Sequence, residues 1–155
     1  MSGSESNEAN TVRGVRGPLV LVVDDDDAIR DALGDVLAEA GFATLSARHG
    51  LDALLVLNEL EEPPSLILLD LMMPVMDGWT FCEVRRRNGS LREIPVVSLS
   101  AVPITRSNWP AGINAFLAKP IDIIELTWIC FRLTGRKNPL LPAEQRQSPQ
   151  TSTAC

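Results

Sequence analysis

The chain alternates between two patterns of hydrophobic residues. Mostly apolar runs of strand length lie within residues 18–23, 65–71 and 94–100, and shorter ones within residues 43–47 and 115–119. Runs that are apolar at consecutive positions are typical of strands buried on both faces of a sheet. Between these runs the apolar residues recur at spacings of three and four, as in Ile29, Ala32, Leu33, Val36, Leu37 and Ala40. This spacing predicts helices over residues 27–40, 51–60, 78–87 and 121–133.

Strands that alternate with helices predict an α/β fold with a parallel sheet, helices on both faces and right-handed crossovers. We expect a flavodoxin-like (βα)5 doubly wound sheet with the strand order 2-1-3-4-5. One crossover departs from the pattern, because residues 101–114 contain Pro103 and Pro110 and show little helical spacing. The sequence therefore predicts a short or distorted fourth helix between the last two strands.

Charge and composition limit the possible functions and cellular locations of the protein. The chain has 155 residues, a net charge of -6 and three cysteines. We assign one domain to residues 18–135, between a disordered arm over 1–17 and a disordered tail over 136–155. The acidity argues against non-specific binding to nucleic acid, and no apolar run approaches the roughly 20 residues of a membrane span. The first residues lack the apolar core of a secretory leader. We therefore expect reduced thiols, a cytoplasmic location, and no contact with nucleic acid or membrane.

Acidic and polar residues gather where the predicted strands end. Asp24 and Asp25 follow the first strand, Asp70 ends the third, Ser100 ends the fourth and Lys119 follows the fifth. The carboxyl ends of parallel strands share one edge of the sheet, so these side chains should lie together. Close carboxylates raise each other's pKa unless cations compensate. Lys119 supplies one positive charge, and Mg²⁺, which binds carboxylate, water and phosphate oxygens, would supply the rest. Such a set of groups is suited to phosphoryl transfer.

Four segments, "LVVDDD", "LLDLMMPVMDGW", "PVVSLSA" and "FLAKP", carry a resemblance to a known family. In this order and at this spacing they resemble the receiver domain of two-component response regulators, over residues 18–135. The resemblance implies that Asp70 is the phosphoacceptor and that Asp24 and Asp25 form the acidic pair that binds Mg²⁺. Asp25 would be the direct ligand, Asp24 would act largely through water, and Met72 would contribute its backbone carbonyl.

The resemblance also implies a conformational switch. Ser100 resembles the switch hydroxyl that bonds one phosphoryl oxygen, and Lys119 resembles the lysine that contacts another. Pro120 resembles the usual cis partner of that lysine. Phe116 stands at the aromatic switch position, which would rotate inward when the acceptor is phosphorylated.

We interpret the chain as a stand-alone response regulator of a two-component or phosphorelay system. It would accept a phosphoryl group on Asp70 from a sensor histidine kinase or a histidine phosphotransferase. It would lose that group slowly by itself, without being an enzyme for another substrate, and would signal to an unknown protein target as a monomer or weak dimer. In the family, polar residues two positions after the acceptor and after the switch hydroxyl help water reach the phosphorus. Met72 and Val102 stand there, so we expect a long-lived phosphoryl group.

Two other functions stay open. One is a receiver-fold interaction module that acts independently of phosphorylation, which the altered fourth helix favours. The other is a phosphatase of the haloacid-dehalogenase type, which would need an aspartate two positions after the nucleophile, where Met72 stands.

Other polar residues have plainer roles. Asp26 or Asp27 should cap the first helix and complement its positive end. Residues 85–87, three consecutive arginines, should form the solvated end of a helix, and His49 should lie on the surface.

Overall fold

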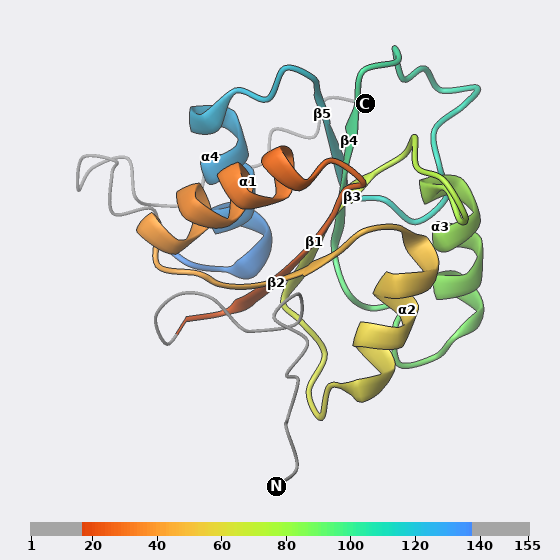
Figure 1. The fold of residues 1–155 in the computed structure, drawn as a ribbon, viewed down its shortest axis with the longest axis horizontal. Helices are drawn as coiled ribbons and strands as arrows, with labels where there is room; N and C mark the ends of the chain where they lie inside the picture. The colour runs from red at the N-terminus through yellow and green to blue at the C-terminus, as the bar shows by residue number, and fades with distance from the viewer. Residues whose placement is uncertain (1–16, 138–155) are drawn as a thin grey trace, which may run out of the picture.

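A single parallel β-sheet with helices on both faces organises residues 17–137, the part of the chain that this computed structural model describes (Figure 1). The strands are β1 (Leu19–Val23), β2 (Ala43–Ala47), β3 (Leu66–Asp70), β4 (Val96–Ser100) and β5 (Ala115–Ala118). The helices are α1 (Asp27–Glu39), α2 (Gly50–Glu59), α3 (Gly78–Arg87) and α4 (Ile123–Thr134). Each predicted strand and helix of the sequence is found at its predicted place, with the exception of the fourth crossover described below.

The strand order is β2-β1-β3-β4-β5, and every neighbouring pair is parallel. The predicted order is therefore confirmed. The register sets which residues are level at the carboxyl edge of the sheet. Val23 lies opposite Leu69 in β3, so the residue after β1 is level with Asp70. Asp70 in turn lies opposite Leu99, and Ser100 lies opposite Ala118. Residues from four strands thus meet at this edge.

Two apolar cores hold the helices to the two faces of the sheet. Helices α1 and α4 cover one face, where Leu33, Leu37 and Leu126 pack against alternate strand residues (Figure 1). Helices α2 and α3 cover the other face, where Val56 and Phe81 pack against the strand residues between them. The central strands β1, β3 and β4 are buried on both faces, so their sequences are largely apolar at consecutive positions, whereas β5 at the edge of the sheet leaves Phe116 and Ala118 exposed.

The crossover from β4 to β5 contains no helix. Residues 101–114 form turns and bends, so the helix that we expected to be short or distorted is absent from this segment. Two contacts tie the segment to α3. The indole Nε1 of Trp79 donates to the carbonyl of Asn108 at 3.0 Å, and Arg85 Nη2 donates to the carbonyl of Gly112 at 2.7 Å.

Arg85 is buried, which corrects the prediction that the arginine run is solvated. Arg86 and Arg87 are exposed, but Arg85 is only 1% exposed. Its guanidinium donates to four backbone carbonyls, those of Leu91, Arg92, Ile94 and Gly112. Burial lowers the pKa of Arg85. The side chain therefore joins α3, the loop before β4 and the crossover after it.

Polar side chains begin the helices. Asp26 is the N-cap of α1 and accepts from the backbone N–H groups of Ala28 and Ile29, as expected for this acidic run. His49, expected on the surface, is the N-cap of α2, and its Nδ1 accepts from the N–H of Asp52 at 3.1 Å.

Some predictions concern residues outside the described range. The disordered arm over 1–17 and the tail over 136–155 fall almost wholly beyond residues 17–137, and they stay predictions. Cys82 and Cys130 are buried free thiols, while Cys155 is not described. Among the described helices, none combines the length and the hydrophobicity needed to span a membrane.

Candidate functional site

The acidic run after β1 divides its carboxylates between different tasks. Asp24 is fully buried, and its two oxygens accept from the backbone N–H of Asp26 at 2.9 Å and from Lys119 Nζ at 2.9 Å. Asp25 is exposed. Asp26 caps α1, and Asp27 forms an ion pair with Arg30. Two of the four acids therefore belong to the edge of the sheet and two to the helix.

Asp70 is the last residue of β3, and only 3% of it is exposed. One of its oxygens accepts from the backbone N–H of Met72 at 3.2 Å, and the other lies 3.4 Å from Lys119 Nζ. Burial, and then the charge of Asp24, raise the pKa of Asp70 to about 6, although the Met72 N–H and Lys119 act in the opposite direction. In the absence of a further cation, ionised Asp70 is thus in an unfavourable environment.

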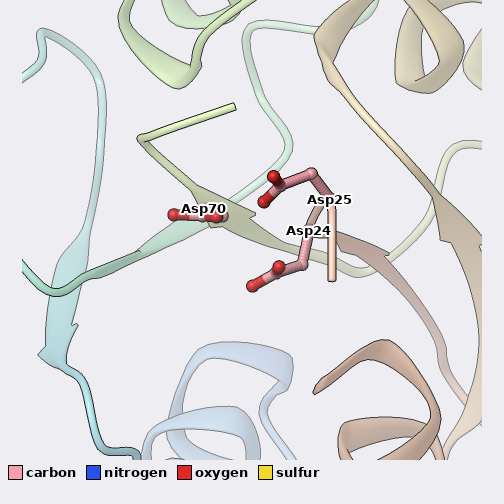
Figure 2. Close-up of side chains that lie close together, drawn as sticks. All are labelled: Asp24, Asp25 and Asp70. Atoms are coloured by element: carbon pink, nitrogen blue, oxygen red, sulfur yellow. The ribbon is translucent and has the colours of Figure 1, made fainter. Parts of the chain in front are cut away.

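Figure 2 shows the carboxyl groups of Asp24, Asp25 and Asp70 gathered at the ends of β1 and β3. One oxygen from each lies within 4.8 Å of the others. Mg²⁺ binds oxygen at about 2.0–2.1 Å, which places the ligands of one ion roughly 3–4 Å apart, so a small shift would bring these three onto one ion. Three carboxylates and one ammonium leave two negative charges, which a divalent cation would balance. The donor set therefore fits Mg²⁺.

Lys119 links the end of β5 to the acids of β1 and β3. Its Nζ lies 2.9 Å from Asp24 and 3.4 Å from Asp70, and its peptide bond to Pro120 is cis, as expected. Burial alone lowers the pKa of Lys119, but the hydrogen bond to Asp24 and the charges of Asp24 and Asp70 outweigh it and raise that pKa. Lys119 is therefore a fixed positive charge beside Asp70.

The two predicted switch residues make contacts with the crossover between β4 and β5. Ser100 is buried, and its Oγ donates to the carbonyl of Val102 and accepts from the N–H of the same residue, both at 3.0 Å. Phe116 is 36% exposed, and its ring meets the ring of Trp109 edge-on at 5.2 Å between centroids. Neither side chain has a hydrogen bond or ring contact with Asp70 among those found in residues 17–137.

Comparison with known proteins identifies the family. The family model for the response regulator receiver domain matches residues 20–130 of this chain. This chain belongs to the response regulator receiver domain family. Receiver domains are signalling modules of two-component systems. They bind Mg²⁺ at an acidic pocket and interact with histidine kinases or phosphotransferases, and this chain has a cluster of three aspartates, Asp24, Asp25 and Asp70, that could hold a metal ion.

Solved structures of receiver domains have the same fold. The receiver domain of Francisella response regulator 1452 is 31% identical, with a TM-score of 0.70 over 77% of this chain and 98% of that one. The receiver domain of the sensor histidine kinase PA1611 from Pseudomonas aeruginosa PAO1 is 28% identical, with a TM-score of 0.69 over the same shares. That structure contains a magnesium ion coordinated in its active site cleft.

Curated relatives are longer than this receiver. The DNA-binding dual master transcriptional regulator RpaA of Synechocystis is 35% identical over 112 residues, which are 70% of this chain and 46% of RpaA. Response regulator Rre1 of the same organism is 32% identical over 76% of this chain and 52% of Rre1. The chain thus spans about half the length of these relatives, and DNA binding belongs to RpaA as a whole protein.

The loop that follows Asp70 leads into α3, whose first residue packs closely against the end of β3. Gly78, the first residue of α3, packs so closely on β3 that a Cβ would lie 2.7 Å from Leu71 Cα and 2.8 Å from the Asp70 carbonyl oxygen. Its N–H donates to the Leu71 carbonyl at 3.0 Å. Only glycine permits this approach. The loop between them is strained, since Val75 has a φ of 67°, an unusual value for a β-branched residue.

Sequence analysis singled out every residue of the acidic cluster but not Trp109. The contact between Trp109 and Phe116 depends on the path of residues 101–114, which the sequence did not predict beyond a distorted helix. The one available signal was a large aromatic residue between Asn108 and Pro110, in a segment without helical spacing.

Proposed function

We propose that Asp70 accepts a phosphoryl group from a phosphohistidine of a partner sensor histidine kinase or histidine phosphotransferase. A carboxylate oxygen of Asp70 would form a bond to phosphorus while the phosphorus–nitrogen bond of the donor breaks. The imidazole nitrogen would leave with the electron pair and take up a proton. Three close carboxylates beside Lys119, in a receiver domain, are the observation that carries this proposal.

The neighbours of Asp70 would divide the work. Asp25, exposed at the mouth of the cluster, would bind Mg²⁺ directly, whereas Asp24, already held by Lys119 and the N–H of Asp26, would act largely through water. The backbone carbonyl of Met72 would complete the protein ligands. Bound Mg²⁺ would neutralise the charge of the transferring group. Lys119 would contact a phosphoryl oxygen, because its Nζ already lies 3.4 Å from Asp70.

The switch would follow from the same group. A phosphoryl oxygen on Asp70 would draw the Ser100 hydroxyl from Val102, and Phe116 would turn inward from its exposed position. Such a local charge event biases an element that has two arrangements. The changed surface would then signal through contact with a target protein or pass the phosphoryl group on.

The experiment is intact-mass spectrometry after incubation with acetyl phosphate and Mg²⁺. The wild-type protein should gain the mass of one phosphoryl group, and Asp70→Asn should not. The matched control is Asp77→Asn, which changes an aspartate in the same loop that caps α3. A gain by Asp70→Asn would show that the acceptor is another residue.

A second candidate is a receiver-fold interaction module that works without phosphorylation. The missing helix between β4 and β5 favours it, because it alters the surface next to the switch residues. No mass gain by the wild type, with target binding that ignores acetyl phosphate, would support this candidate instead.

A further inference from the structure

The contact between Trp109 and Phe116 involves none of the three residues of the acidic cluster. The two rings meet edge-to-face, with an interplanar angle of 86° and centroids 5.2 Å apart. Both residues are partly exposed, at 39% and 36%. Perpendicular aromatic pairs of this kind attract each other beyond the area that they bury. The pair therefore favours the conformation in which Phe116 points outward.

Phe116 lies beside the small residues that it would meet on turning inward. Its neighbour Leu117 packs in the core beneath α1 and α4, so Phe116 projects from the opposite face of β5. Phe116 lies opposite Ser98 of β4, and the pair two positions farther along, on the same face of the sheet, joins Ser100 to Ala118. Ser98 is fully buried, and within the described residues its Oγ has no hydrogen-bond partner. Small side chains thus flank Phe116 on β4.

Trp109 is held in place from outside the switch. The carbonyl of the preceding residue, Asn108, accepts from Trp79 of α3. The side chain of Asn108 closes its own turn, since it accepts from the N–H of Thr105 at 2.6 Å and donates to the carbonyl of Pro103 at 3.2 Å. Trp109 therefore stands on an anchored turn rather than on a loose loop.

Both switch residues are engaged by the same crossover. Ser100 Oγ holds the backbone of Val102 near its start, and Phe116 contacts Trp109 farther along. We infer that Trp109 is a positioning residue that holds Phe116 outward in the unphosphorylated protein, and that residues 101–109 are the element that the switch releases. The second half of this inference rests on the proposed function. The crossover between β4 and β5 thus changes conformation although it contains no helix.

The first part can be tested without any phosphoryl group. Protein labelled with 4-fluorophenylalanine gives a ¹⁹F resonance for Phe116, assigned by its loss in Phe116→Leu. The change of that resonance between H₂O and D₂O reports its exposure. Trp109→Leu should reduce this change, because Phe116 no longer has a partner outside. Trp109→Phe retains a ring and should restore it.

The matched control is Trp128→Leu, which removes the same side chain from α4 on the other face of the sheet. It should leave the Phe116 resonance unchanged. Equal exposure of Phe116 in the wild type, Trp109→Leu and Trp109→Phe would overturn the inference, and so would an equal effect of Trp128→Leu.

The second part uses beryllofluoride with Mg²⁺ as a stable analogue of the phosphoryl group. In protein labelled with 5-fluorotryptophan, the Trp109 resonance should move on addition and the Trp128 resonance should not. Trp109→Leu should bind the analogue roughly 2- to 10-fold more tightly, because the ring contact no longer favours the outward state.

The outcomes separate the two claims. A wild-type protein that takes neither acetyl phosphate nor beryllofluoride would refute the proposed function, and the unliganded test would still decide the role of Trp109. A wild type that is phosphorylated with no movement of Trp109, or a Trp109→Leu protein with unchanged affinity, would overturn the inference and leave the proposed function standing.

Discussion

Replacing Asp70 with asparagine should stabilise the metal-free protein at neutral pH, although it removes the proposed phosphoacceptor. Burial and the charge of Asp24 raise the pKa of Asp70 from 3.8 to about 6 in the folded protein. In the unfolded chain both causes disappear. The folded state therefore binds this proton more tightly than the unfolded state, and the contribution of Asp70 to stability is lost as the pH rises from 3.8 through about 6.

The size of the effect follows from the two pKa values. Each unit of difference is worth about 1.4 kcal/mol, so the full loss is about 3 kcal/mol. According to the linkage relation, roughly 2 kcal/mol of the stabilising contribution of Asp70 is still present at about pH 4.5, and almost none of it is present at about pH 7.5. An asparagine amide does not titrate. The free energy of unfolding of Asp70→Asn, minus that of the wild type, should therefore increase by about 2 kcal/mol between these conditions.

Urea denaturation followed by circular dichroism, in buffer with a metal chelator, measures this difference directly. The comparison is valid if both proteins unfold with the same dependence on urea. Asp35→Asn, which changes an exposed acid on α1, is the control and should not give the same pH curve. If the difference is independent of pH, burial of the Asp70 carboxylate carries no cost. If it falls as the pH rises, Lys119 outweighs burial, and the reasoning is refuted.

Three further predictions concern the metal, the buried arginine and the lifetime of the phosphoryl group. Mg²⁺ should raise the melting temperature of the wild type but not of Asp25→Ala, since a ligand that binds only the folded state stabilises it; equal shifts would remove Asp25 from the ligand set. Arg85→Lys should lower the free energy of unfolding, measured by urea denaturation, by about 2 kcal/mol, because an ammonium group cannot donate to all four carbonyls that Arg85 bonds. A loss near zero would show that water molecules donate to these carbonyls in the variant. Met72→Asn combined with Val102→Glu should speed loss of the phosphoryl mass roughly tenfold to a hundredfold, because polar side chains can orient the attacking water; unchanged decay would contradict this role of the two apolar residues.

The fold and the acidic cluster were predictable because their determinants are local. Five apolar runs of strand length, separated by helical spacing, fix the strands and leave few topologies for a parallel sheet. Once the strands are placed, the residue after β1 and the last residue of β3 must meet at the carboxyl edge. Asp24 and Asp70 therefore lie together for reasons that can be read from their positions after two hydrophobic runs.

Arg85 shows where such reasoning failed and what could have corrected it. A run of three arginines suggests solvent, but position 85 continues the buried face of α3, which is formed by Gly78, Phe81 and Cys82 at spacings of three and four. The spacing alone would place Arg85 inside. The composition of the run indicates the opposite, because a buried guanidinium needs several acceptors. Those acceptors are loop carbonyls, and their positions depend on the tertiary fold.

The missing helix and the buried arginine are two aspects of one arrangement. The 14 residues between Ser100 and Ala115 must lead the chain from the end of β4 back to the start of β5, a distance of about one strand, or roughly 16 Å. A fully extended segment of 14 residues is about three times as long, so the connection can be made with or without a helix. A helix would, however, satisfy its own backbone groups, whereas a turn-rich segment must find partners elsewhere. Here the side chains of Arg85, Trp79 and Asn108 bond three of its carbonyls. A receiver domain that loses this helix thus needs donors from α3, and the crossover gains fixed contacts that a phosphoryl group on Asp70 could break at Val102 and Trp109 without unfolding the segment.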